Sequence, residues 1–267
     1  MNNQFPVIFV GAGPGDPELM TIKGQKALMN ADVVIYTGSL VPEAVLQWTQ
    51  PNTEKLNSAS MTFDQVHQVI VDAWNQGKQV IRLHTGDPSL YGAIFEQMAY
   101  LDLHNIPYSV IPGITAAFAA SAAMKIEYTL PGITQTLILT RIEGRTPVPE
   151  TEALSALAQH QTSMAIYLSI HHIDRVSMIL KEAYGEDQAC AVAYKVSQPE
   201  EKIIRTTLAE LANTVQQEGI THQALIIVSK VLNIHHDDII HNISHQSRLY
   251  APDFSHTYRQ QQERIEE

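Results

Sequence analysis

The chain has 267 residues, of which 45% are apolar and 17% are charged, a balance that excludes an intrinsically disordered polypeptide. Its formal net charge is −11 and no run of Lys and Arg forms a basic patch, which argues against a general binder of nucleic acid. A chain of this length predicts two domains of about 120 residues each.

The sequence carries no pattern of a targeting or membrane segment. Residues 1–7 lack a basic segment followed by an apolar core, which predicts no signal peptide. The longest stretch of low charge, residues 112–124, is too short to span a bilayer, and its alanines favour a closely packed helix. Cys190 is the single cysteine, so we expect no intramolecular disulfide and a small core residue. These features predict a soluble cytoplasmic protein without a membrane partner.

Short apolar runs alternate with helical patterns along the chain. In the first half we expect strands at 6–13, 32–38, 79–87 and 108–113, and helices at 20–30, 64–76 and 91–104. In the second half we expect strands at 136–141, 164–169, 189–196, 202–208 and 224–231, and helices at 150–160, 173–184 and 207–218. The alternation predicts α/β domains with mostly parallel or mixed sheets covered by helices.

A stretch rich in proline and glycine, residues 111–117, is the expected domain junction. We therefore expect an N-terminal α/β domain over 1–113 and a C-terminal α/β domain over 114–243. A polar, irregular tail is expected over 244–267.

The first strand leads into a glycine-rich turn, FVGAGPGDPELMT at 9–21, which resembles a nucleotide-binding turn but departs from its pattern. A dinucleotide fingerprint requires glycine at the place of Asp16. Asp16 and Glu18 suit a helix N-terminus but repel a phosphate, and Pro14 and Pro17 remove two backbone donors. The turn thus permits close approach of a ligand without phosphate, or is a strand-to-helix turn without any ligand.

Two further turns combine glycine and proline after an apolar strand, HTGDPSLYG at 84–92 and IPGITAA at 111–117. The carboxyl ends of parallel strands meet at one edge of a sheet, where ligands bind. Three such turns predict a ligand cleft, although Gly-Asp-Pro is also good turn chemistry by itself.

The segments VGAGPGDPELMTIKG, LHTGDPSLYGAIFEQM and VIPGITAAFAASAAM resemble the tetrapyrrole C-methyltransferase family, which uses S-adenosylmethionine. Within that family, YTGSLVPEAVL at 36–46 and SRLYAPDFSHTYR at 247–259 are similar to the C11-methyltransferases of precorrin-4 or cobalt-precorrin-4 in cobalamin synthesis. The resemblance runs across almost the whole chain. It implies two α/β domains with the cofactor folded into a cleft between them, a tetrapyrrole substrate and a homodimer. S-adenosylmethionine carries a sulfonium cation and no phosphate, which fits the chemistry of the first turn.

The resemblance also implies the cofactor contacts, many of them through backbone groups. In the three turns they fall on Pro14, Thr85, Gly86, Asp87, Leu90, Thr115 and Ala116. The family often has methionine where this chain has Leu168, and we expect apolar contact with adenine to survive. A later glycine contact falls near Val196, where the backbone of Ala193 or Ser197 is expected to replace it.

Direct methyl transfer from the sulfonium to C11 requires in-line placement and dry surroundings, and no strong base. We expect Asp87 to have a polar role near the reacting centre as a catalytic residue, with turn capping as the alternative. Expected substrate contacts are Thr37, Gly38, Ser39, Arg141 and Lys195. The last two would pair with substrate carboxylates, ordinary surface charge being the alternative.

No metal site is predicted, because no acid or cysteine completes the histidine pairs into a ligand set. These pairs are His171 with His172, His235 with His236, and His241 with His245. Three other functions stay open. They are a methyltransferase of the same fold acting at another ring position or on uroporphyrinogen III, a nucleotide-dependent oxidoreductase, and a binding or scaffold protein without activity.

Overall fold

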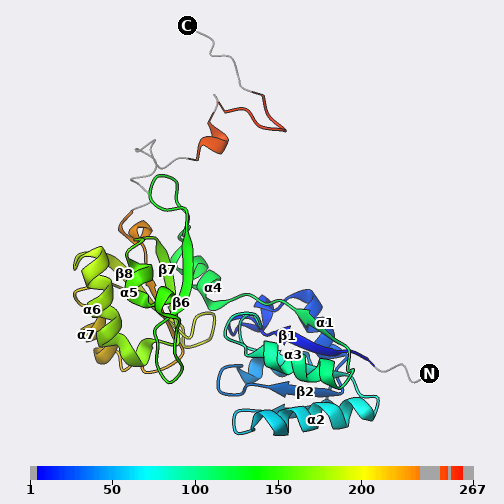
Figure 1. Ribbon diagram of the computed structural model, residues 1–267. Coiled ribbons are helices and arrows are strands. Elements are labelled where there is room, and N and C mark those ends of the chain that lie inside the picture. The colour runs from blue at the N-terminus through cyan, green and yellow to red at the C-terminus, as the bar shows by residue number, and fades with distance from the viewer. Residues whose placement is uncertain (1–4, 235–246, 252–253, 261–267) are drawn as a thin grey trace. The chain divides into compact units, whose positions relative to one another are not determined.

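A computed structural model describes residues 5–234, 247–251 and 254–260, which form two compact units (Figure 1). The first unit contains the described residues up to Lys125, together with Ala193–Ile204 and Thr221–Leu225. The second contains Ile126–Val192, Arg205–Ile220 and the described residues from Ile226 onwards. The first unit is therefore discontinuous in sequence, which no local pattern indicates. The boundary expected between residues 113 and 114 stays a prediction.

The first sheet has five strands in the order β3-β2-β4-β1-β5. Their bounds are β1 Val7–Gly11, β2 Val33–Tyr36, β3 Glu54–Asn57, β4 Val80–His84 and β5 Tyr108–Ile111. Every neighbouring pair is parallel, as the alternation of strands and helices predicts. The edge strand β3 was not expected, because its sequence EKLN is polar and mostly exposed.

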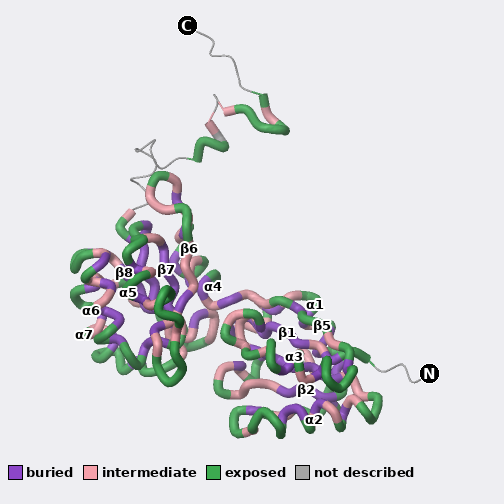
Figure 2. Tube along the Cα trace, viewed as in Figure 1, coloured by how far each residue is buried: buried purple, intermediate pink, exposed green. Residues whose placement is uncertain are grey.

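Helices cover both faces of this sheet. α1 (Ile22–Met29) and the 3₁₀ helix η2 (Glu43–Trp48) share an apolar cluster with Val10. α2 (Phe63–Asn75) and α3 (Ile94–Leu103) share a second cluster with Phe9, the neighbour of Val10 in β1. Figure 2 shows the buried residues of these elements in purple. Adjacent strand residues point to opposite faces, so α1 and α3 lie on opposite sides. α1 links β1 to β2 and α3 links β4 to β5, which places the reversal of strand order between β1 and β4. In open parallel sheets, that reversal marks the crevice where ligands bind.

The second sheet is mixed and has the order β6-β7-β10-β8-β9. Its strands are β6 Leu137–Arg141, β7 Ser163–Tyr167, β8 Ala189–Tyr194, β9 Lys202–Thr207 and β10 Ala224–Val228. β6 pairs with β7 in parallel, and β7 pairs with β10 antiparallel. The described α-helices of the second unit are α5 Leu154–Ala158, α6 Ile173–Tyr184 and α7 Leu211–Gln217, whereas α4 Ala116–Met124 belongs to the first unit. The expected α/β class with parallel and mixed sheets is confirmed.

Several helices begin later than their patterns predict. Tyr91 and Ala93 have left-handed φ angles of 58° and 49°, so α3 begins at Ile94 and not at residue 91. The amide of Leu208 donates to the carbonyl of Gln188 at 3.0 Å, which prevents α7 from starting at 207. Residues 150–160 split into a 3₁₀ turn and α5. No helix of the described residues has both the length and the apolarity that a membrane crossing requires.

Two basic side chains of β4, Arg82 and His84, are buried in the first unit. Arg82 donates through Nε to Gln97 Oε1 at 3.1 Å and through Nη1 to the carbonyl of Ile35 at 3.1 Å. Burial lowers the pKa of Arg82 to about 10, so it stays charged at neutral pH. Burial first, and then the charge of Arg82, lower the pKa of His84 to about 3. Its Nε2 is buried without a hydrogen-bond partner among the described residues.

The neutral, buried His84 makes stability depend on pH. Its folded pKa of about 3 lies below the unfolded value of about 6.5, so acid protonates only the unfolded state. Stability therefore falls as pH drops below about 6.5, by roughly 1 kcal/mol between about pH 7 and about pH 5.5 from this group. We expect His84→Phe to remove this part of the loss, measured by urea unfolding at both pH values. An equal loss in the two proteins would contradict the prediction.

Candidate functional site

The turns after β1 and β4 are joined by backbone hydrogen bonds at the reversal of strand order. Gly13 donates to the Gly86 carbonyl at 3.2 Å, and Gly86 donates to the Gly13 carbonyl at 2.8 Å. The amide of Ala12 donates to the His84 carbonyl at 2.7 Å. Gly13 and Gly86 have φ angles of 77° and 59°, in the left-handed region that favours glycine. The sequence pattern thus reflects a backbone requirement of this junction.

The third turn closes on the first two through a second set of glycines. A Cβ atom added to Gly113 would lie 2.1 Å from the carbonyl oxygen of Gly86. A Cβ atom added to Gly11 would lie 2.6 Å from the Cα of Gly113. Real Cβ atoms do not approach backbone this closely, so only glycine allows the contact. All three turns predicted from the sequence therefore meet at one edge of the sheet.

Asp87 links the second turn to the third with both carboxylate oxygens. Oδ2 accepts from the amide of Gly113 at 2.9 Å. Oδ1 accepts from the amide of Ser89 at 2.9 Å and from its hydroxyl at 2.5 Å. Partial burial opposes ionisation, but the hydrogen bonds from Ser89 and Gly113 outweigh it and lower the pKa of Asp87. Turn capping, the alternative considered for Asp87, is thus what its contacts show, while a role in catalysis stays a prediction.

The carboxylate of Asp16 stabilises the first turn itself. Asp16 Oδ1 accepts from the amide of Glu18 at 2.8 Å and caps the 3₁₀ helix Pro17–Leu19. The amide of Asp16 donates to the hydroxyl of Ser197 at 3.0 Å. Ser197 therefore faces the first turn with its side chain.

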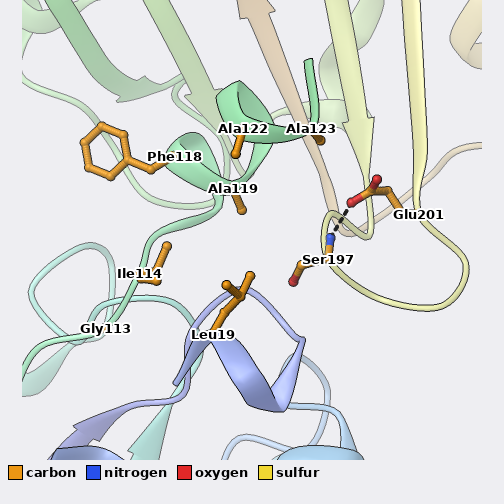
Figure 3. Close-up of a pocket in the computed structure, with 9 residues that line it drawn as sticks. All are labelled: Leu19, Gly113, Ile114, Phe118, Ala119, Ala122, Ala123, Ser197 and Glu201. Carbon is orange, nitrogen blue, oxygen red and sulfur yellow. Dashed lines mark hydrogen bonds between the residues drawn. The ribbon is translucent and has the colours of Figure 1, made fainter. Parts of the chain in front are cut away.

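A pocket of about 640 Å³ opens beside the first and third turns (Figure 3). Its lining residues are Leu19, Gly113, Ile114, Phe118, Ala119, Ala122, Ala123, Ser197 and Glu201. Four of them belong to α4, and three of these four are alanines, whose small side chains leave space for a ligand. Among these lining residues Glu201 alone carries a charge, and no cation is present for a phosphate. A volume of this size suits a small organic ligand.

Some of the expected cofactor residues lie in or next to the glycine turns, and others do not. Thr115 directly follows the pocket residue Ile114 and occupies the N-cap position of α4, and Ala116 is the first residue of that helix. The amide of Leu90 donates to the carbonyl of Asp87 at 3.2 Å, which places it in the second turn. Ala193 is buried, and its expected backbone contact with the cofactor stays a prediction.

Leu168 lies in the second unit at the end of β7, has a left-handed φ of 54° and is 61% exposed. Contact of this apolar side chain with an adenine stays a prediction. The expected cofactor cleft between two domains stays a prediction.

The expected substrate residues of the first unit lie in two loops. Thr37, Gly38 and Ser39 follow β2, the neighbour of β4, so they flank the second turn. Asn57 Oδ1 accepts from the amide of Gly38 at 3.2 Å and holds this loop. Lys195 pairs with Glu200 at 3.4 Å and lies over the ring of Tyr194.

Arg141, in the second unit, uses its guanidinium within its own loop. Nη1 donates to the carbonyls of Ile142 at 3.3 Å and Thr146 at 3.2 Å, and Nη2 donates to that of Pro147 at 2.7 Å. These bonds organise the loop after β6 and leave less of the guanidinium for a carboxylate. A substrate contact by Arg141 stays a prediction.

Three residues that face the turns were not identified from the sequence. Gln198 covers Gly15, Glu201 accepts from the amide of Ser197, and Ser89 binds Asp87. Only Ser89 had a local signal, as the second residue after a turn aspartate. The other two reach their partners from far along the chain.

The described residues contain no group of three or more His, Cys, Asp or Glu able to hold a metal ion. His171 and His172 form the 3₁₀ turn Ile170–His172. The remaining pairs, at positions 235, 236, 241 and 245, lie outside the described residues. Cys190 is buried, and burial raises the pKa of its thiol to about 12, as fits a core residue.

Comparison with known proteins gives one consistent family. Residues 6–212 match the tetrapyrrole (corrin/porphyrin) methylases. A cobalt-precorrin-4 C(11)-methyltransferase of Methanocaldococcus jannaschii is 50% identical over 97% of this chain and 98% of its own length. The solved structure of a cobalt precorrin-4 methyltransferase of cobalamin biosynthesis superposes with a TM-score of 0.84 at 42% identity, covering 87% of this chain and 98% of that one.

A more distant relative has been solved with a bound ligand. It is the uroporphyrin-III C-methyltransferase of Thermus thermophilus complexed with S-adenosyl homocysteine. Its TM-score is 0.69 at 26% identity, and the match covers 85% of this chain and 93% of that one. Fold, glycine turns and sequence similarity agree, and the chain belongs to the tetrapyrrole (corrin/porphyrin) methylase family.

Proposed function

We propose that this protein transfers a methyl group from S-adenosylmethionine to C11 of precorrin-4 or cobalt-precorrin-4, a step of cobalamin biosynthesis. The observation that carries the proposal is the meeting of three glycine turns at the reversal of strand order. The 50% identity to a cobalt-precorrin-4 C(11)-methyltransferase supports the choice of substrate and ring position. The S-adenosyl homocysteine complex of a more distant relative supports the choice of cofactor.

The chemistry of the turns fits S-adenosylmethionine better than a nucleotide. A Cβ atom on Gly86 would make ordinary contact with Thr115 Cα at 3.7 Å and the Ile114 carbonyl at 3.9 Å, so the glycine leaves open a cradle that a larger side chain would fill. Pro14 and Pro17 offer no amide donors, and Asp16 and Glu18 disfavour a phosphate. A nucleotide-dependent oxidoreductase is thereby the weaker alternative.

The residues that would hold the cofactor lie mainly at the three turns. Backbone groups of Pro14, Thr85, Gly86 and Thr115 would bind its adenosine and amino-acid ends, with Leu90 and Leu168 as apolar contacts. When bound, the cofactor supplies an electrophilic methyl group on a sulfonium cation. A cation is compatible with a pocket whose one charged lining residue is Glu201.

Catalysis by this chain then consists of placement and exclusion of water. The carbon to be methylated is already electron-rich, so the protein needs to align it with the methyl group in a dry site. The apolar side chains of Leu19, Ile114 and Phe118 line the pocket and exclude water. Asp87 fixes the third turn against the second and acts by positioning.

Substrate recognition is proposed for Thr37, Gly38 and Ser39, with Lys195 as a partner for a carboxylate. Family membership also supports a homodimer in the cytoplasm. Sedimentation velocity separates dimer from monomer, and a monomer at micromolar concentration would contradict the dimer.

An assay of binding followed by turnover tests the proposed function. We expect calorimetry to detect S-adenosylmethionine binding and no tight binding of NAD or FAD. With precorrin-4 and cobalt-precorrin-4 offered separately, mass spectrometry should show the gain of one methyl group, and NMR should place it at C11. The preferred substrate identifies the aerobic or anaerobic route.

Each remaining alternative has its own outcome in this assay. Methylation only of uroporphyrinogen III, or at another ring carbon, would contradict the C11 assignment. Cofactor binding without methylation of any tetrapyrrole would favour a binding protein.

A further inference from the structure

The loop between β8 (Ala189–Tyr194) and β9 (Lys202–Thr207) contacts the first glycine turn from far along the sequence. The hydroxyl of Ser197 accepts from the amide of Asp16 at 3.0 Å, across a separation of 181 residues. Gln198 Nε2 donates to the carbonyl of Pro14 at 3.4 Å, across 184 residues. All of these residues belong to the first unit.

Gln198 also explains why the turn has a glycine at position 15. A Cβ atom added to Gly15 would lie 2.4 Å from Cγ of Gln198. The side chain of Gln198 therefore lies directly against the turn backbone, between its two prolines in sequence. A larger residue at position 15 would displace Gln198.

The loop holds Ser197 in an unfavourable backbone conformation. Ser197 and Lys195 have left-handed φ angles of 65° and 43°, which residues with a Cβ rarely adopt. Oε2 of Glu201 accepts from the amide of Ser197 at 2.6 Å (Figure 3). The amide of Lys195 donates to the carbonyl of Gln223 at 2.9 Å. Such a conformation persists when surrounding contacts fix it, and it is frequent at functional sites.

The contacts of Ser197 and Gln198 anchor the backbone between Pro14 and Asp16. Pro14 and Pro17 have no amide hydrogen, so the amide of Asp16 is one of the few donors able to anchor this backbone. Ser197 takes that donor, and Gln198 takes the Pro14 carbonyl. Both contacts therefore fix the segment that would face the cofactor.

We propose that Ser197 and Gln198 are positioning residues that hold the first turn in the shape required for S-adenosylmethionine, with Glu201 orienting Ser197. The inference rests on the proposed function, because it names the cofactor of that function. It assigns the Ser197 side chain to the turn and requires no contact between that side chain and the methyl group.

The test compares Ser197→Ala, Gln198→Ala and Glu201→Ala with the full-length wild type. Loss of one hydrogen bond typically corresponds to a factor of about 2 to 10 in an equilibrium constant. We expect each variant to raise the calorimetric Kd for S-adenosylmethionine by about fivefold. We also expect KM for the cofactor to rise in proportion while kcat stays within about twofold of the wild type.

Two further variants separate positioning from general loosening of the fold. Ser197→Asn offers an oxygen acceptor in a residue that tolerates left-handed φ, so it should restore part of the affinity. Thr53→Ala is the matched control, because Thr53 Oγ1 donates to the Ala31 carbonyl at 2.9 Å at the amino edge of the sheet, away from the turns. It should leave cofactor affinity unchanged.

Amide exchange of the turn, measured by mass spectrometry on peptides that cover residues 12–20, is a readout without cofactor. Faster exchange of this segment in Ser197→Ala than in Thr53→Ala supports the proposal. Unchanged affinity and unchanged exchange in Ser197→Ala and Gln198→Ala would overturn it. If the wild type does not bind S-adenosylmethionine, the proposed function fails, while the exchange experiment still decides whether the loop holds the turn.

Discussion

Replacement of Gly86 by valine is expected to abolish binding of S-adenosylmethionine while the chain stays folded. Gly86 has a φ of 59° and faces Thr115 Cα across the distance of an ordinary van der Waals contact. The first atom of a side chain fits there, but the methyl groups of valine project into the proposed cofactor cradle. A valine in this backbone conformation also costs about 1–2 kcal/mol. That cost is smaller than the stability of an ordinary domain.

The control for Gly86→Val is Gly219→Val. Gly219 has a similar φ of 65°, but a Cβ added there meets no atom within 4 Å. Both variants therefore place valine in a similar left-handed backbone conformation, and only Gly86→Val also places its side chain among the three turns. We expect similar losses of stability in urea and loss of calorimetric binding for Gly86→Val alone. Unchanged cofactor affinity in Gly86→Val would contradict the cleft at these three turns.

Replacement of Asp87 by alanine is expected to destabilise the protein by about 2–3 kcal/mol and to weaken cofactor binding. The variant loses the bond from Oδ2 to the Gly113 amide and both bonds from Ser89. Hydrogen bonds to a charged group contribute about 1.5–3 kcal/mol, and part of that value is the cost of an amide left without a partner. The third turn should then move relative to the second, which displaces Thr115 and Ala116.

The same residue predicts a dependence of stability on acid pH. The folded pKa of Asp87 is lowered from its usual 3.8, so its contribution is present above about pH 4 and is lost as pH falls through the folded value. Asp87→Asn should lack this part of the acid sensitivity, because its amide does not titrate. Urea unfolding at about pH 3 and about pH 6 measures the difference.

Kinetics of the Asp87 variants separate positioning from catalysis. A positioning residue predicts a higher KM for the cofactor with partial rescue by asparagine, which retains one oxygen acceptor. A loss confined to kcat, with normal cofactor affinity and no rescue, would assign Asp87 a direct role near the reacting centre instead.

Local patterns were sufficient for the class of fold and for the edge of the sheet that carries the site. Helical periodicity places α2 within a residue of its expected bounds, because Thr62 and Gln65 form a capping box and the apolar stripe faces the sheet. The glycines at 11, 13, 86 and 113 were visible as turn residues because each lies in a glycine- and proline-containing stretch after an apolar run, and the left-handed φ angles of Gly13 and Gly86 are local properties of the backbone. Pro14 and Asp16, which depart from a dinucleotide fingerprint, could also be identified from the sequence alone.

Which residues the glycines and Asp87 contact could not be predicted from the sequence, because these contacts join segments that are distant along the chain. β1 lies between β4 and β5, and that order brings Gly11, Gly86 and Gly113 into contact. The local pattern alone did not distinguish a catalytic Asp87 from a capping one, because the Gly113 amide arrives from a different strand. The edge strand β3 was not predicted for another reason, since a polar, exposed strand has no apolar pattern.

The first turn shows most clearly which properties are local and which depend on tertiary contacts. Sequence alone identified FVGAGPGDPELMT as a close turn that disfavours phosphate, because proline, glycine and aspartate act through local geometry and charge. The reason for Gly15 and the use of the Asp16 amide became evident only with the β8–β9 loop in place. Gln198 and Ser197 reach that turn through tertiary packing, and no periodicity or spacing in a single chain encodes a contact across 181 residues.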